Sequence, residues 1–464
     1  MFGTLLAREI RRLASSPVQW GLLLLLAAAA AWAVGSGLEW RETKLAEQTL
    51  VPGEMSERPE EWMGALEKAE AGESISPFQA QPMALGFPAI LPPGPLGDFS
   101  FGRDALYPHY AIVQGWRNSA SLFRRYEVEG PTTLATGRLD LTFVVVVLLP
   151  LVLILLGFDS LSAERENKRL PLLLVQGVRP GSIVAARLSV AATATWAIVA
   201  IAAGVGLLLA DAPERVARFA VWWSAMTAYC LFWVAIVALV AASFRRQTNA
   251  ALAALGAWIG LVVVIPSGVQ FATAALHPPP SQVELLTSAR RAEAEARQHI
   301  EERAEIYMAE HPSDEAPAEG VPGFYRAAYL ANLDVEERTA PLLDAFEESH
   351  AAQDRLADSL QLFSPVMVAH DILTSVSGAG FGRTAAFQQQ VRRHLQILLD
   401  AIGPATVGQR RLSVAEARAI PAFEYSEPAI PQGTWRWIGL LLGWTAVASV
   451  LAMRRLAGVR KNPL

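Results

Sequence analysis

The sequence predicts an all-α polytopic membrane protein with six transmembrane helices and two large, mainly helical extracytoplasmic insertions. Six apolar runs are each long enough for a helix to cross a hydrocarbon layer of about 30 Å. With 52% hydrophobic and 18% charged residues, the chain is too apolar for an ordinary soluble domain. Basic residues also gather in every second segment between the runs. The predicted spans are residues 18–38, 141–161, 188–210, 219–243, 250–273 and 436–456.

The positions of the cations predict how these spans are oriented. The short basic segments are residues 1–17, the connection 162–187, the turn that holds Arg245 and Arg246, and the tail 457–464. Because short cation-rich segments stay in the cytoplasm, both termini are expected to be cytoplasmic. The long connections 39–140 and 274–435 are then expected on the outside, since long loops cross regardless of charge.

The first 17 residues are predicted to form an amphipathic helix on the membrane surface. Apolar side chains fall near one helical face and arginines lie around the other, as in helices at a lipid–water interface. A helical lead-in to the first span is the alternative. The first span is expected to be an uncleaved anchor, because it is long for a signal peptide and no small-residue cleavage site follows it. The apolar set is Phe2, Leu5, Leu6, Ile10 and Leu13, and the basic set is Arg8, Arg11 and Arg12.

Both long connections are predicted to be mostly helical. Proline is frequent over residues 87–102, so we expect this segment to form no long helix and to pair with no strand. Pro150 and Pro266 fall within the second and fifth spans and predict kinks that could shape a translocation route, with ordinary packing bends as the alternative. Cys230, the only cysteine, falls in the fourth span, so the outer regions are expected to fold without disulfides. The expected helices are residues 39–50 and 59–71 in the first connection, and 282–309, 335–363 and 385–402 in the second.

The connection 162–187 is the strongest candidate for a mechanistic element. It follows Asp159 and is highly charged over Glu164–Arg169. Pro171 suits the first turn of a helix, and Gly177 suits the left-handed residue just after one, so a short helix is expected at Leu170–Gln176. Such a helix under the membrane can dock on a soluble partner and pass a rigid-body movement to the adjacent spans. A charged turn that only stops translocation is the alternative.

This connection resembles the inner loop of type-2 ABC transporter permeases. The resemblance rests on Asp159, Glu164–Arg165–Glu166, the leucine-rich half-helix, Val178–Arg179 and basic Arg187. The chain departs from that family at Lys168–Arg169, where the family has Gly-Thr, and at Pro171. Residues 87–110 and 362–394 are similar to the outer regions of a bacterial permease subgroup that carries a large domain of unknown function in its last external loop.

The resemblance implies an ABC permease subunit in a bacterial inner membrane. Its implied partners are a separate ABC ATPase subunit, a second permease copy or related permease, and the lipid bilayer. ATP and Mg²⁺ are expected on the ATPase, with no cofactor in this chain. The residues expected to couple to the ATPase are Asp159, Glu164, Arg165, Glu166, Arg169, Leu170, Leu173 and Arg179.

Signals for other chemistry are weak. No Gly-Lys dipeptide occurs, and a phosphate-binding loop needs one. The seven histidines form no HExxH motif and no close pair, and no Gly-x-Ser-x-Gly elbow occurs. The net charge of −5 does not suggest a nucleic-acid partner. The alternatives to a permease are a membrane-anchored envelope scaffold or binding protein with a periplasmic partner, and a membrane enzyme without a visible catalytic constellation.

Overall fold

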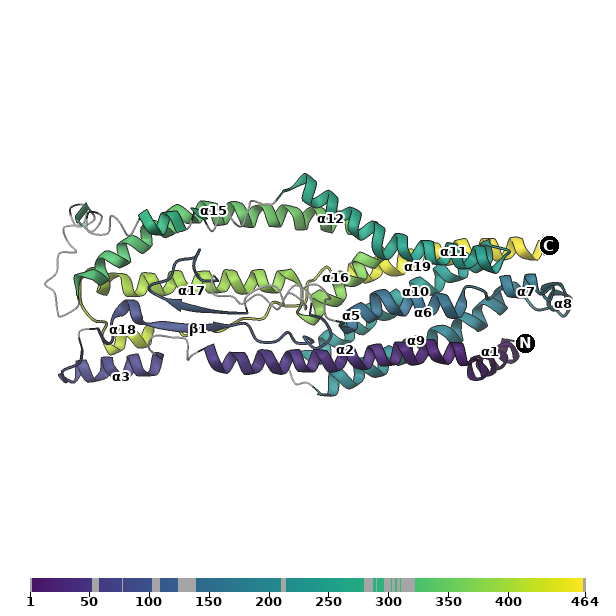
Figure 1. The fold of residues 1–464 in the computed structure, drawn as a ribbon, viewed down its shortest axis with the longest axis horizontal. Coiled ribbons are helices and arrows are strands. Elements are labelled where there is room, and N and C mark those ends of the chain that lie inside the picture. The colour runs from purple at the N-terminus through teal and green to yellow at the C-terminus, as the bar shows by residue number, and fades with distance from the viewer. Residues whose placement is uncertain are drawn as a thin grey trace.

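Helices account for most of the chain and run along one long axis (Figure 1). Helix α1 (Phe2–Ser15) and the end of α19 (Thr434–Lys461) lie at one end, which we call the proximal end. Helices α3 (Pro59–Glu70) and α18 (Val414–Ala419) lie at the other, distal end. This computed structural model describes residues 2–461 except 52–57, 77, 102–108, 124–138, 210–213, 279–286, 289, 296–301, 303–304, 307–308 and 310–321.

Six helical segments in the described chain are long and apolar enough to cross a membrane, which confirms the predicted number of spans by length and composition. Most extend past the predicted limits, because polar flanking turns continue the helix. The helices of these segments are α2 (Pro17–Leu50), α5 (Leu141–Phe143) with α6 (Leu149–Gly157), α9 (Pro180–Leu209), α10 (Arg215–Ser243), α11 (Gln247–Ile259) with α12 (Ile265–Leu276), and α19.

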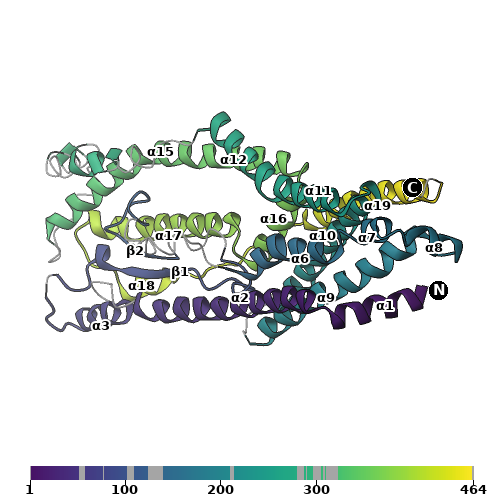
Figure 2. The ribbon, with the colours of Figure 1, turned by 45° about the vertical axis from the view of Figure 1, so that its right-hand side comes forward.

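The α5–α6 segment and α10 form the centre of the bundle. In each, 67% of the apolar window is buried, against 6% in the α11–α12 segment, which therefore stands at the edge. Helix α10 packs along α19, and α2 packs along α9 (Figures 1 and 2). The centre includes the fully buried rings of Trp222, Tyr229 and Trp233 from α10.

Both proline-containing spans include a π-helical turn just before the proline. Val144–Leu148 (η4) precedes Pro150, and Gly260–Val264 (η5) precedes Pro266. Proline has no N–H for the carbonyl four residues earlier, and a wider turn accommodates that loss. A π-helical turn thus precedes each proline for which the sequence predicted a kink.

The two long connections share one hydrophobic core, and together they form what we call the distal module. Helix α3 of the first connection contributes Trp62, while α17 (Phe381–Val407) of the second contributes Phe387 and Leu398, and all three are buried. The module also contains α15 (Gly323–Gln361) and α18, and α16 (Pro365–Ser377) links it to the spans. The buried face of α17 is formed by Phe387, Val391, Leu395 and Leu398, which recur at helical spacing in the sequence.

The prediction that the proline-rich residues 87–102 take no part in strand pairing is wrong. Strand β1 (Gly86–Ile90) pairs antiparallel with β2 (Tyr110–Gln114), and Pro88 lies opposite Ile112. A strand of a two-stranded sheet has one free edge, so a proline is tolerated when its nitrogen faces that edge. A short 3₁₀ turn, Pro82–Ala84 (η2), precedes β1. Most of the predicted helix 282–309 lies outside the described residues.

Two arginines of α10 fasten the proline-rich segments to the spans. Arg215 is buried and donates to Asp98 Oδ2 (2.9 Å), to the carbonyl of Gly206 (2.6 Å) and to that of Pro95 (3.2 Å). Arg218 donates to the carbonyl of Pro428 at 2.6 Å. Segments from both long connections are therefore held by one helix at the point where it leaves the apolar bundle.

Candidate functional site

Residues 158–179 connect the second and third apolar spans, and we call this segment the inner loop. It contains the predicted short helix. Helix α7 (Ser162–Glu166) and helix α8 (Leu170–Val175) follow one another, and Pro171 lies in the first turn of α8. Gly177 has φ +82°, as predicted for the residue after the helix. The N–H of Gly177 bonds to the carbonyl of Leu174, and that of Val178 to the carbonyl of Leu173, which is the Schellman pattern of a helix end.

Helix α7 ends in the same way, but without a glycine. The N–H of Lys168 bonds to the carbonyl of Arg165, and that of Arg169 bonds to the carbonyl of Glu164. Lys168 consequently has φ +55°, a left-handed conformation in which its Cβ crowds the backbone. The Lys168–Arg169 departure noted in the sequence therefore falls at a backbone position that suits glycine.

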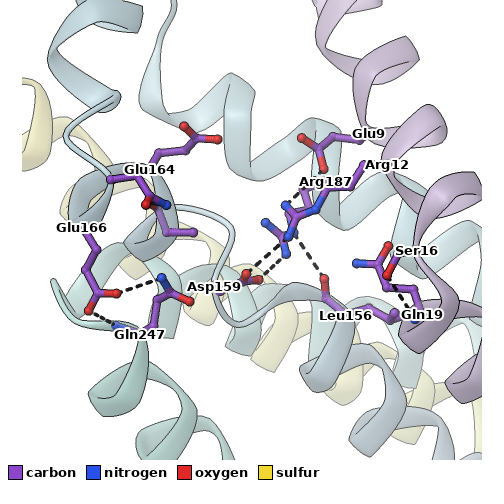
Figure 3. A network of polar contacts seen from close by, with 12 residues as sticks. Glu9, Arg12, Ser16, Gln19, Leu156, Asp159, Glu164, Glu166, Arg187 and Gln247 are labelled. Atoms are coloured by element: carbon purple, nitrogen blue, oxygen red, sulfur yellow. Dashed lines mark hydrogen bonds and ion pairs between the residues drawn. The ribbon is translucent and has the colours of Figure 1, made fainter.

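Asp159 ties this loop to two other helices (Figure 3). Its Oδ1 accepts a hydrogen bond from Arg187 of α9, and its Oδ2 accepts one from Arg12 of α1 at 3.4 Å. Arg187 also donates to the carbonyl of Leu156 at 3.3 Å. Only 7% of the Arg187 side chain is exposed, so this contact belongs to the packed interior of the proximal end.

The charged residues of α7 make three further connections. Glu164 pairs with Arg8 of α1 at 3.0 Å, and Arg165 donates to the carbonyl of Phe244 at 2.9 Å. Glu166 accepts from the backbone N–H and the side chain of Gln247, at 2.9 and 2.8 Å (Figure 3). Sequence reasoning assigned these residues to a partner ATPase. In the structure they bind α1 and the junction of α10 with α11.

Helix α8 projects from this network with one apolar side uncovered. Leu172 and Val175 are 66% and 88% exposed. Of the two leucines expected to dock, Leu170 is fully buried and Leu173 is half-buried. Residues three apart share a helical face, so the burial of Leu170 and Leu173 predicts that Leu172 and Val175 point away. Because all six residues of α8 are apolar, the sequence carried no signal that distinguished the exposed pair from the buried pair.

Exposed cations lie before and after α8 in the chain, namely Lys168 and Arg169 before it and Arg179 after it. We call these three residues, together with Leu172 and Val175, the α8 tip, an apolar knob flanked in sequence by cations. Its chemistry suits an apolar recess with carboxylates at its edge, since apolar contact supplies affinity and complementary charge supplies orientation.

Part of the chain is similar to a known protein family. The model of a domain of unknown function (DUF3526) matches residues 282–426, which lie in the connection between the fifth and sixth apolar spans. No curated protein matches the chain. The matched region includes α15, α16, α17 and α18, and the inner loop with the α8 tip lies outside it.

Proposed function

We propose that the chain is the membrane-spanning permease subunit of an ABC transporter, which moves an unidentified substrate across a bacterial inner membrane. The observation that supports this proposal best is the α8 tip, because an apolar knob exposed beyond a membrane bundle is suited to docking on a soluble partner. A separate ATPase subunit would bind ATP and Mg²⁺. A second copy of the chain, or a related permease, would complete the translocation path.

The connections of the inner loop support a role in passing movement to the spans. A push on α8 reaches α9 through Asp159 and Arg187, and it reaches the α10–α11 junction through Glu166 and Gln247. Both connections join packed helices that move as rigid elements. We therefore assign docking to the α8 tip, and we assign to the charged residues of α7 the task of linking it to the bundle.

The test is whether the chain co-purifies with a stand-alone ABC ATPase of the same organism and stimulates its ATP hydrolysis. We expect Leu172→Glu and Val175→Glu each to abolish co-purification and stimulation, while the chain still inserts into membranes. Gln176→Glu adds the same charge one residue beyond α8 and is the matched control, expected to retain both. Normal stimulation by both glutamate variants would overturn the assignment.

Charge reversal at Glu164 and Glu166 provides a second arm. Sequence reasoning predicts that it abolishes stimulated hydrolysis without affecting insertion. Because both carboxylates bond within the chain, we expect it also to lower the thermal stability of the purified chain, whereas Leu172→Glu should not. Loss of stimulation with unchanged stability would instead indicate direct contact of these carboxylates with the ATPase.

Orientation is part of the proposal, with both termini and α8 in the cytoplasm. Val175→Cys offers an exposed thiol, and the native Cys230 is buried. A membrane-impermeant maleimide should label Val175→Cys only after sealed cells are opened. Labelling of intact cells from outside would place the α8 tip beyond the reach of any cytoplasmic ATPase.

The second candidate function is a membrane-anchored scaffold or binding protein. A groove of about 510 Å³ on the distal module favours it, between α17 and the extended segment after α18. Burial lowers the pKa of His394 at its wall, so the ring is neutral at pH 7. Co-purification of a partner that binds the distal module, without any ATPase, would favour this function. The lining residues are Gln390, Arg393, His394, Ile397, Pro421, Ala422, Phe423 and Glu424.

A further inference from the structure

Helix α1 has an uncovered face at the start of an apolar span. It is strongly amphipathic, and none of its described residues is fully buried. It packs against α9 and bends away from α2 at Ser16, whose hydroxyl caps α2 by accepting the N–H of Gln19 (Figures 2 and 3). The exposed face includes Arg8, Ile10 and Arg11, while Leu13 on the other side packs against the core of the bundle.

The helix that follows α1 in the chain has exposed apolar residues. Leu24, Leu25 and Trp32 of α2 are 62%, 66% and 71% exposed, which is typical of side chains that face lipid. Helix α1 therefore lies where a lipid tail region would end and headgroups would begin. The cations exposed on α1 in that place suit anionic headgroups by charge.

Two arginines of α1 pair with the inner loop through partly exposed side chains. The side chains of Arg8 and Arg12 are 47% and 41% exposed while they pair with Glu164 and Asp159. Arg187 also binds Asp159, but its side chain is 7% exposed. Lipid phosphates can thus reach the two arginines of α1 and cannot reach the arginine of α9.

An exposed ion pair contributes little to the free energy of folding. The free energy that attracts one arginine to an anionic membrane surface is of similar size. The two interactions therefore compete on nearly equal terms. We propose that α1 binds anionic lipid headgroups, and that Arg8 and Arg12 then exchange Glu164 and Asp159 for lipid phosphates. Helix α1 is released from the inner loop, while Arg187 keeps the loop on α9. The lipid composition of the membrane thereby sets how firmly the inner loop is held.

The experiment measures the distance between α1 and the inner loop in reconstituted full-length chain. Spin labels are placed at Ala7→Cys and Gln176→Cys in a Cys230→Ser background, since both positions are exposed. We compare vesicles of phosphatidylcholine with vesicles of phosphatidylcholine and phosphatidylglycerol in equal parts. The anionic vesicles should raise the ratio of the longer-distance to the shorter-distance population roughly tenfold, as expected for two competing pairs of about 1.4 kcal/mol in total. High salt should reverse the change.

Matched variants separate this proposal from general effects of charge. Arg8→Gln with Arg12→Gln should make the distance the same in both kinds of vesicle. Arg338→Gln removes a cation of the distal module that is 42% exposed and also paired, and it should leave the lipid response intact. Inorganic phosphate added to phosphatidylcholine vesicles should have no effect, because the proposed ligand is a membrane surface.

Two outcomes would overturn the proposal. One is an identical distance distribution in neutral and anionic vesicles, and the other is a lipid response that persists in the double arginine variant. Neither readout involves an ATPase or a substrate. A failure here therefore leaves the proposed transport function untouched, and the absence of ATPase stimulation leaves this proposal untouched.

Discussion

The hydroxyl of Tyr229 donates a hydrogen bond to the carbonyl oxygen of Val146 across 2.8 Å. Val146 lies four residues before Pro150, which has no N–H to offer that carbonyl. Trp258 donates to the next carbonyl, that of Val147, at 3.2 Å. Side chains from the fourth and fifth spans thus satisfy backbone groups of the second span, where lipid would offer no substitute.

This relationship predicts a coupling between Tyr229 and Pro150. Tyr229→Phe leaves a buried carbonyl without a donor and should lower the free energy of unfolding by about 1–3 kcal/mol. Pro150→Ala restores an N–H for Val146, so Tyr229→Phe should cost less in that background. A double-mutant cycle of denaturant unfolding in detergent measures the difference. Equal costs in both backgrounds would contradict the coupling.

The left-handed backbone of Lys168 predicts that glycine is the better residue there. Lys168→Gly removes the crowded Cβ and should strengthen the end of α7 by about 0.5–1 kcal/mol. Amide hydrogen exchange at Arg169, whose N–H bonds to Glu164, should become slower. Gly177→Lys makes the opposite change at the end of α8 and should speed exchange at Val178. Faster exchange in Lys168→Gly would show that the lysine side chain contributes more than the strain costs.

The buried pair of Arg215 and Asp98 predicts a large effect of removing one partner. Arg215→Leu leaves the carboxylate of Asp98 buried without its cation, which should cost about 3–5 kcal/mol. The double variant with Asp98→Leu should recover a large part of the loss. Arg418→Leu, which breaks the exposed pair with Glu67, is the control and should cost less than about 1 kcal/mol. Thermal unfolding in detergent gives the comparison, and similar costs for the two arginines would contradict it.

Asp371 of α16 predicts a pH dependence of stability. Burial, and then the charge of Asp358, raise the pKa of Asp371 to about 6. The native state therefore holds this proton more tightly than the unfolded chain, so the free energy of unfolding should fall as pH rises from about 4 to about 6.

Asp371→Asn should remove that part of the profile and stabilise the chain by about 2 kcal/mol at pH 7.5. Unfolding midpoints measured between pH 4 and pH 8 test this. Asp344→Asn removes an exposed carboxylate from α15 and serves as the control. A stability loss at pH 7.5 in Asp371→Asn would mean that the ionised carboxylate makes a favourable contact.

The sequence was sufficient for features that depend on neighbours along the chain. Six spans follow from the length of apolar runs, and the short helix with its left-handed Gly177 follows from local turn chemistry. The buried face of α17 follows from helical periodicity around Phe387. Each of these depends on interactions within a few residues, so no knowledge of distant contacts is needed.

Only the tertiary structure decided which charged residues of the inner loop bind within the chain. Glu164 meets Arg8 across 156 positions of sequence, and Glu166 meets Gln247 across 81. The exposed side of α8 and the common core of the two long connections have the same origin. A side chain's partner depends on how whole helices pack, and packing joins segments whose order along the chain does not reveal their distance in space.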